Sequence, residues 1–284
     1  MTSAARQART VRIGMVGGHI ACLAAYETGV SAVALLVAGV AYVLRAFGVT
    51  AGFHRLLAHG AFKAGRMTQF TLALLGSLAT QGGPLWWVSH HRNHHRYSDA
   101  PLDIHSPRQR GFWYAHMGWM WDKTSFETVG ANIKELYRFP ELKVLQRCYP
   151  LLVVVQGVIF YALGVLINHY FPESGTTGAQ MLVWGFIIST VALWHATFMV
   201  NSVCHTWGRR TYETGDDSTN NPFVALLTLG EGWHNNHHKY AYSARHGLEW
   251  WQVDPTYLGL RTLESVGLVS DLKLPRKAAA AAAA

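Results

Sequence analysis

Four apolar stretches restrict this sequence to folds in which long helices lie in nonpolar surroundings. A helix needs about 20 residues to cross the hydrocarbon core of a bilayer. Helices satisfy their own backbone hydrogen bonds there, where water is absent. We therefore predict an all-α integral membrane protein with four transmembrane helices, at residues 11–26, 31–53, 151–170 and 181–203.

Composition supports a membrane protein with a substantial water-facing part. Hydrophobic residues make up 50% of the chain and charged residues only 14%, against roughly 25% charged in soluble domains. The formal net charge is +8, but no block of Lys and Arg stands out. We therefore expect no nucleic-acid partner. Anionic lipid headgroups or an acidic redox partner fit this charge better.

The basic residues predict the orientation of the chain in the membrane. Apart from Arg45, every Lys and Arg lies in the leading segment up to Arg12, between residues 55 and 147, or after residue 205. The short loops after the first and third spans carry none. Cytoplasmic loops are enriched in Lys and Arg. We therefore expect a multi-pass protein, in a bacterial inner membrane, whose cytoplasmic helical cap comprises residues 54–149 and 204–277.

We treat residues 1–277 as a single membrane domain and the terminal run Ala278–Ala284 as an artefact outside it. The apolar run Phe70–Ala79 is too short to span a bilayer and predicts an interfacial or re-entrant helix. With this topology, an even number of spans separates the dense histidine clusters. All of them then meet on one side of the membrane.

Three histidine motifs, "HRLLAH", "HRNHH" and "HNNHH", form these clusters. On a helix, residues three or four apart share a face, so His91 and His95 can converge on one metal ion. His94 points about 100° away from His95 and can reach a second ion. The spacing predicts a histidine-rich dimetal site built from His54, His59, His91, His94, His95, His234, His237 and His238.

Imidazole nitrogens suit iron, zinc, copper and nickel. A single zinc ion, usually four-coordinate, cannot use so many ligands, so two iron ions are the better match. Isolated histidines are more often polar residues that face water or cap a helix. We apply this interpretation to His19, His169, His195 and His246 and leave His105 and His116 undecided.

The motifs resemble those of the membrane fatty acyl desaturases, specifically the stearoyl-CoA desaturase-like branch. In this sequence, "GVTAGFHRLLAH" is similar to the first histidine box of that family. "HRNHHRYSDAPLDIHSPRQRGFWYAHMGW" is similar to its second box. "NSVCHTWG" and "GEGWHNNHHKY" resemble a later ligand segment and the third box. The resemblance extends from about Tyr42 to Trp251 and, because several motifs agree, is highly specific.

The resemblance implies further site residues. His205 would be a ninth metal ligand, and Asn201 would reach the second metal through a water. Gln81, Trp87 and Thr197 would bend the acyl tunnel, whose closed end would lie near Tyr42 and Ala46. The implied catalytic and metal-binding set is His54, His59, His91, His94, His95, Asn201, His205, His234, His237 and His238.

The substrate carrier stays open at this stage. Relatives that use acyl-CoA hold the CoA group with an Arg-Asp pair, which is replaced here by Ser89 and His90. Acyl-CoA, acyl-lipid and acyl-carrier-protein (acyl-ACP) substrates are therefore all considered. We expect His90 to lie behind the ligands or face headgroups rather than bind metal. The sequence has no cytochrome b5 motif, so we expect a separate electron donor such as ferredoxin, rubredoxin or cytochrome b5 with a reductase.

The implied reaction is insertion of a cis double bond, at the delta-9 position, into a saturated acyl chain with O2 and two electrons. No side chain is basic enough to deprotonate a methylene group, so a metal cofactor must carry this chemistry. We expect Asp99, Asp103, Asp216 and Glu231 to orient the histidines, unless they are ordinary surface carboxylates. An alternative is a membrane di-iron alkane or fatty acyl hydroxylase. A metal carrier is disfavoured because the spans hold few polar residues.

Overall fold

The structure of the chain, a computed structural model, describes residues 2–126 and 130–275. The terminal run Ala278–Ala284 lies outside the described residues. The described chain is mainly helical. Its elements are α1 (Ser3–Ala21), η1 (Cys22–Ala24), α2 (Ala25–Thr28), α3 (Ala32–Phe47), η2 (Gly48–Ala58), β1 (Lys63–Ala64), α4 (Arg66–Leu78), α5 (Pro84–Tyr97), α6 (Pro107–Arg110), α7 (Phe112–His116), η3 (Gly118–Trp121), η4 (Lys123–Phe126), η5 (Gly130–Asn132), η6 (Lys134–Arg138), α8 (Pro140–Tyr170), η7 (Pro172–Ser174), α9 (Gly178–Gln180), η8 (Met181–Ile188), α10 (Ser189–Ser202), α11 (Pro222–Leu227), α12 (His234–Lys239), α13 (Pro255–Ser265) and β2 (Val269–Ser270).

Three continuous helices are long and apolar enough to cross a membrane: Ala32–Ala58, Pro140–Tyr170 and Gly178–Ser202. They contain most of the second, third and fourth predicted spans. The first predicted span, residues 11–26, is divided among α1, η1 and α2 and is not among the candidate helices of the described residues. A membrane-spanning helix at residues 11–26 therefore stays a prediction.

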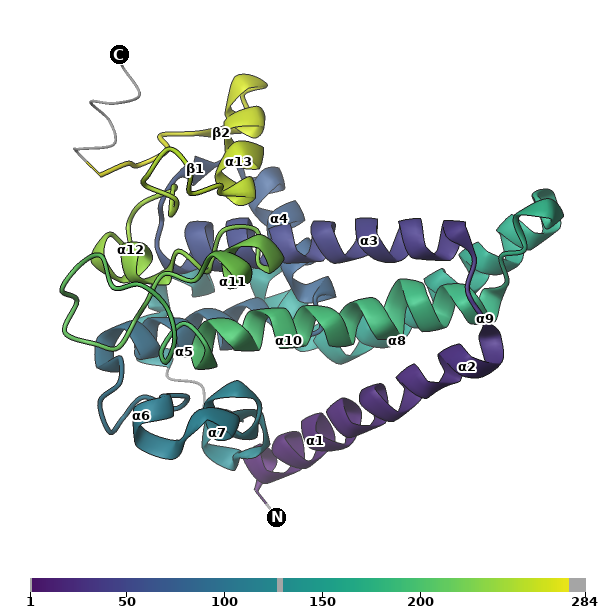
Figure 1. Ribbon diagram of the computed structural model, residues 1–284, viewed down its shortest axis with the longest axis horizontal. Helices are drawn as coiled ribbons and strands as arrows, with labels where there is room; N and C mark the ends of the chain where they lie inside the picture. Colours follow the sequence, from purple (N-terminus) through teal and green to yellow (C-terminus); the bar gives the residue numbers. More distant parts are fainter. Residues whose placement is uncertain (1, 127–129, 276–284) are drawn as a thin grey trace.

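The short helices and the turns occupy opposite ends of the long helices. Figure 1 shows α5, α6, α7, α11 and α12 at one end of α3 and α10, and α2 and α9 at the other. At the α9 end, the hydroxyls of Ser31 and Thr176 lie 2.8 Å apart, and Gln180 Nε2 donates to the Thr28 carbonyl over 3.0 Å. Ser31 also accepts a hydrogen bond from the backbone N–H of Ala34 and so caps α3. These polar contacts join the two turns.

The long helix Ala32–Ala58 changes from α to π geometry at Gly48. In an α-helix, residues five apart point about 140° away from each other. A π-helix pairs residues five apart through its hydrogen bonds. Here the backbone N–H of His59 donates to the carbonyl of His54 over 3.2 Å. The two rings lie 5.0 Å apart, so the π geometry brings both histidines of "HRLLAH" to one site.

Helix α4, which contains most of the run expected to be a short helix, packs closely against η2. A Cβ atom on Gly48 would lie 2.2 Å from the backbone nitrogen of Gly76. A Cβ atom on Gly52 would lie 2.6 Å from the carbonyl oxygen of Leu72. Such distances are far below van der Waals contact, so the crossing requires glycine on η2. The same crossing fixes the segment that carries His54.

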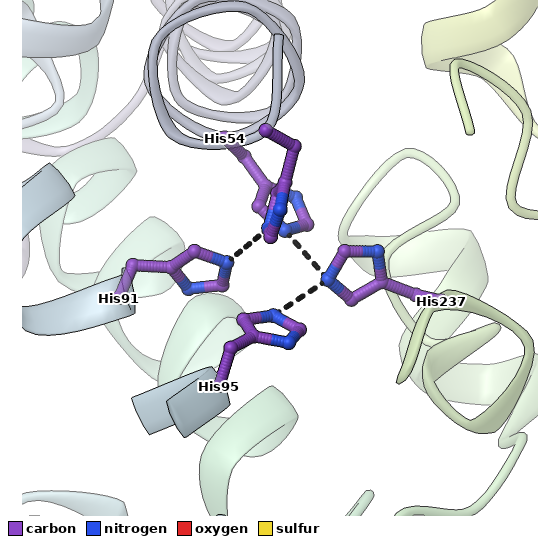
Figure 2. A group of neighbouring side chains, drawn as sticks. His54, His91, His95 and His237 are labelled. Atoms are coloured by element: carbon purple, nitrogen blue, oxygen red, sulfur yellow. Dashed lines mark hydrogen bonds between the residues drawn. The ribbon is translucent and has the colours of Figure 1, made fainter. Parts of the chain in front are cut away.

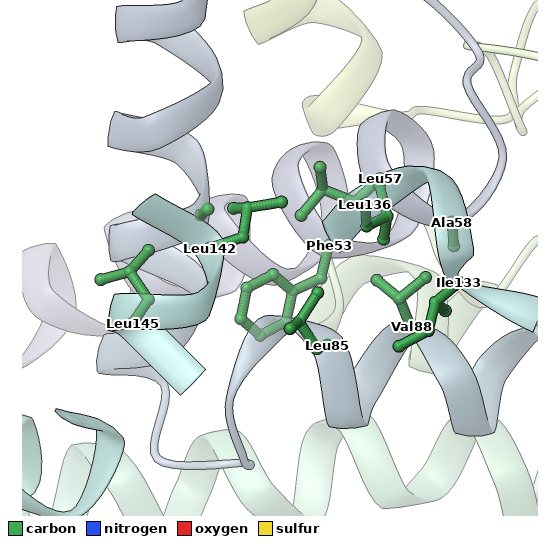
Figure 3. Close-up of a cluster of buried hydrophobic side chains, with 10 residues drawn as sticks. Phe53, Leu57, Ala58, Leu85, Val88, Ile133, Leu136, Leu142 and Leu145 are labelled. Atoms are coloured by element: carbon green, nitrogen blue, oxygen red, sulfur yellow. The ribbon is translucent and has the colours of Figure 1, made fainter. Parts of the chain in front are cut away.

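A buried hydrophobic cluster joins η2 to α5 and α8 (Figure 3). Phe53 comes from η2, Leu85 and Val88 from α5, and Leu142 and Leu145 from α8. Phe53 directly precedes His54, and α5 also carries His91. The cluster therefore sets the relative position of two histidine-bearing helices. A small antiparallel pair, β1 with β2, lies elsewhere in the chain.

The glycine crossing predicts that Gly48→Ala destabilises the protein, because the new methyl group overlaps the α4 backbone. We expect a loss of about 1–3 kcal/mol, as for an overpacked core, and a lower apparent Tm in detergent. Gly39→Ala, in α3, is the matched control because nothing lies within 4 Å of its Cβ position. It should be neutral or stabilising by up to about 1 kcal/mol. Equal losses in the two variants would contradict this account.

Candidate metal centre

Nine histidines form two neighbouring groups. Each ring offers one nitrogen, and within each group these nitrogens all lie within 4.8 Å of one another. Figure 2 shows four members of the first group, which come from η2, α5 and α12. The five-histidine group comprises His54, His59, His91, His95 and His237, and the four-histidine group comprises His94, His205, His234 and His238.

Helices α5 and α12 each contribute to both groups. His91 and His95 of α5 join the five-histidine group, while His94 joins the other. In α12, His237 lies in the first group and His238 in the second. The rings of His95 and His238 are 4.5 Å apart, so the two groups adjoin. The His-x-x-His-His spacing of both helices thus places histidines in two adjacent sites, as the rotation of about 100° per residue in an α-helix predicts.

Four buried carboxylates lie against the Nδ1 atoms of group members. Asp103, Asp99 and Asp216 accept hydrogen bonds, whereas Glu231 makes a close ion-pair contact with His54. The distances are 2.6 Å for His54 to Glu231, 2.9 Å for His94 to Asp103, 2.8 Å for His205 to Asp99 and 2.6 Å for His238 to Asp216. Each carboxylate is at most 8% exposed, which excludes the alternative of ordinary surface carboxylates. An Nδ1–H that donates to a carboxylate leaves the Nε2 lone pair free to bind metal.

The carboxylates are themselves held in charged networks. Arg55 is fully buried and pairs with Glu231 and Asp254 at 3.0 Å each. His246 Nδ1 also lies 3.2 Å from Glu231. Burial by itself would raise the pKa of Glu231, but His54, His246 and Arg55 lower it well below its usual value. Glu231 is therefore ionised and can orient His54.

The remaining histidines are held neutral. Removal from water, together with neighbouring imidazoles, lowers the pKa values of His59, His91, His95, His234 and His237 well below the usual value. A neutral imidazole keeps a lone pair for metal binding. Burial would raise the pKa of Asp216, but His238 lowers it, so this carboxylate keeps its charge.

The nitrogen atoms converge in a way that suits cations. Nε2 of His59 lies 2.8 Å from Nε2 of His91, and Nε2 of His205 lies 3.0 Å from Nε2 of His234. Within the described chain, His234 Nδ1, His237 Nδ1 and His238 Nε2 have no hydrogen-bond partner. Buried polar atoms without partners are costly. Neutral imidazoles backed by carboxylates form a donor set that fits divalent transition metals.

The residues expected to shape an acyl tunnel lie beside these groups. Gln81, Trp87, Thr197 and Asn201 line a small cavity of about 70 Å³, which His91 also lines. The ring of Trp87 stacks on His91 at 4.9 Å between centroids. The expected closed end, Tyr42 and Ala46, lies in an apolar cluster that also contacts Trp87.

The single histidines differ in how well they meet the expectations. His90 lies outside both groups, is only 5% exposed and lines the small cavity, which favours the expected position behind the ligands over one that faces headgroups. Burial lowers its pKa to about 4. His246, expected to face water or cap a helix, is 1% exposed and bonded to Glu231. His105, left undecided, lies with His94 and Asp103. No local sequence signal distinguishes His246, because its partners are distant in the chain.

His19 and His195, also expected to be isolated, lie together in a chain of hydrogen bonds. Nε2 of His19 is 2.9 Å from Nε2 of His195, whose Nδ1 is 2.9 Å from Nε2 of His116. Nδ1 of His116 lies 2.9 Å from the hydroxyl of Ser202. These contacts link α1 to α10 and α7. Of the four histidines treated as isolated, only His169 is exposed as expected.

Comparison with known proteins identifies the class. A family model described as "Fatty acid desaturase" matches residues 31–263. The chain belongs to the fatty acid desaturase family, which confirms the resemblance seen in the motifs. Members of this family are oxidoreductases, and the histidine groups are compatible with metal binding.

Three relatives illustrate the range of the family. An icosanoyl-CoA 5-desaturase of Limnanthes douglasii is 45% identical over 81% of this chain and 62% of its own length. A palmitoyl-monogalactosyldiacylglycerol delta-7 desaturase of Arabidopsis thaliana is 42% identical over 84% of this chain and 62% of its own. An sn-1 stearoyl-lipid 9-desaturase of Anabaena variabilis is 39% identical over 92% of each chain. The chain thus spans less than two thirds of the first two relatives.

The separate carboxylate partners predict that one group can be weakened alone. Asp216→Asn removes the charge that holds His238, so metal should leave the four-histidine group while the five-histidine group stays loaded. Changes of this kind lower metal affinity by about 10–100-fold. Metal per chain is measured after dialysis against a graded chelator series.

The neighbouring Asp217→Asn serves as the control. The Asp217 side chain pairs at the surface with Arg210 and Arg108, and only its backbone N–H contacts Asp99. This variant should retain the wild-type metal content. Parallel release curves for the two variants would contradict a specific role for Asp216.

Proposed function

We propose that this chain is a single-domain membrane fatty acyl desaturase that inserts a cis double bond into a saturated acyl chain, using O2 and two electrons. The observation that carries this proposal is the pair of adjoining histidine groups beside a cavity lined by Gln81, Trp87 and Thr197. Overall, two methylene groups lose one hydrogen each, and O2 takes up these hydrogens, two electrons and two protons to give two waters.

We propose two iron ions as the resident metals, one in each histidine group. Nine nitrogen donors exceed what two four-coordinate zinc sites use, which favours a metal of higher coordination number. Asn201 would complete the four-histidine group through a water. Iron supplies the O2-dependent oxidation that no side chain can perform. The chain's own contribution is to hold neutral imidazoles in fixed orientations through Glu231, Asp99, Asp103 and Asp216.

The substrate residues act by position. Gln81, Trp87 and Thr197 would hold the acyl chain bent, so that one pair of C–H bonds lies next to the metals. Holding the chain in one alignment lowers the entropic cost of reaching the reactive geometry. Tyr42 and Ala46 would form the closed end that limits chain length. For the double bond we propose delta-9, because the 9-desaturase of Anabaena variabilis is matched over 92% of each chain.

We propose that α1 is a fourth membrane helix and that the histidine groups face the cytoplasm of a bacterial inner membrane. This orientation is supported by the concentration of Lys and Arg at the end of the long helices where the histidine groups lie. Electrons would come from a separate protein, such as ferredoxin, rubredoxin or cytochrome b5 with its reductase. The net charge of +8 favours an acidic donor.

Expression in a host that lacks its own desaturase tests the activity. We expect a new cis-unsaturated fatty acid when iron and a reductase system are supplied, and none with His94→Ala. His169→Ala changes an exposed histidine at the end of α8 and should keep full activity. Fatty-acid profiling by mass spectrometry locates the double bond. A hydroxylated product without a new double bond would support the hydroxylase alternative instead.

A second test concerns chain length. Tyr42→Ala removes the ring at the proposed closed end, so the product profile should shift to longer acyl chains. Tyr42→Phe loses only the hydroxyl, which donates to the Leu227 carbonyl at 2.7 Å, and should keep the original profile. Tyr26→Ala, at an 89% exposed position, is the surface control. An unchanged profile in folded, active Tyr42→Ala would contradict this placement of the closed end.

A further inference from the structure

A second, much larger cavity of about 1050 Å³ lies between α1 and the pair formed by α8 and α10. Its walls include Met15 of α1, Val153 of α8, and Val191 and Trp194 of α10. Figure 1 shows α1 running at an angle to these helices. Two of the three walls therefore belong to candidate membrane helices, and the side chains named here are apolar or aromatic.

The large cavity adjoins the small cavity beside the histidine groups. Gln81, Trp86, Met120 and Phe198 line both this cavity and the small one that His91 lines. A flexible apolar chain lying in the large cavity can therefore extend past Gln81 toward the metals. On the proposed function, the large cavity is the side from which the acyl group reaches the reaction site.

The cavity is amphipathic along its length. One end is lined by Ser3, Arg6 and Gln7 at the start of α1 and by Gln146 and Arg147 near the start of α8. Arg6 and Arg147 are exposed, and within the described residues neither forms an ion pair. Arginine side chains at the boundary between hydrocarbon and water keep their charge in the headgroup region and bind phosphate oxygens well.

The volume of the cavity says more about its occupant. Pockets for single small ligands enclose about 300–1,000 Å³, so this one lies at the upper end of that range. An apolar cavity of this size, walled in part by candidate membrane helices and ending in two exposed arginines, fits a lipid with an anionic head and bulky acyl chains. A soluble thioester carrier would instead need an extended polar surface for its large headgroup.

We propose that the acyl substrate is delivered as an anionic glycerophospholipid, which enters between α1 and α8 from the bilayer and places its phosphate against Arg6 and Arg147. One acyl chain then passes Gln81 to the metals, and the other stays in the large cavity. Helix α1 suits entry on this side because it buries only Ala8 and Met15. This inference rests on the proposed desaturase function and specifies its substrate class.

The test uses the full chain in vesicles with iron and an electron-donor system. Three stearoyl substrates are compared: phosphatidylglycerol, the uncharged monogalactosyldiacylglycerol, and stearoyl-CoA. The double variant Arg6→Gln with Arg147→Gln should raise the apparent KM for the anionic lipid about tenfold and leave kcat unchanged. It should not change the kinetics with the uncharged lipid.

The matched control is Arg9→Gln with Arg12→Gln. It removes the same charge from exposed positions of α1 that do not line the cavity, so its KM should equal that of the wild type. If the control matches the cavity variant, general membrane attraction explains the effect and the headgroup site is overturned. Equal losses on anionic and uncharged lipids would overturn it too.

A binding measurement separates this inference from the proposed activity. Native mass spectrometry of the purified protein should show bound phosphatidylglycerol in the wild type and the control, but not in the cavity variant. This readout needs no turnover, so it stands even if no substrate is desaturated. If the wild type desaturates only stearoyl-CoA, the desaturase function holds and the glycerophospholipid inference is overturned.

Discussion

The pairing of buried imidazoles with buried carboxylates is the interaction on which the candidate metal centre depends. Each of the four contacts favours one position of the ring proton and turns the other nitrogen toward the neighbouring histidines. The carboxylates come from three separate segments, around Asp103, Asp216 and Glu231. Their negative charges would offset the cost of holding metal ions in a site removed from water. Without them, rings on four different segments would have no common orientation.

These imidazole–carboxylate contacts form only because the backbone brings the histidine-bearing segments together. The π geometry of η2 turns His54 and His59 to the same side, which an α-helix would not do. Gly48 and Gly52 then allow α4 to pack directly on η2. Phe53 secures the other side by packing with α5 and α8. One short segment thus combines an unusual helix geometry, a close helix crossing and a core contact, all next to a proposed metal ligand.

The sequence predicted those features that depend on local spacing. Helical periodicity assigned His91 and His95 to one site and His94 to another, and hydropathy located three of the long helices. It failed where the partners lie far apart in the chain. His19 and His195 are bonded across 176 residues, and neither segment alone shows the contact. The cavity beside α1 likewise depends on helix angles, which no residue pattern encodes.

The centre and its entrance are built differently. Around the histidines, the carboxylates are held by further residues from distant segments, as in the pairing of Arg55 with Glu231 and Asp254. Helix α1, by contrast, buries two side chains, and part of its attachment is the His19–His195 contact. A site that aligns one pair of C–H bonds requires rigidity, because small displacements are costly. A site that admits a bulky lipid requires a wall that moves. The distribution of contacts favours both the proposed alignment at the histidines and the proposed lipid entry beside α1.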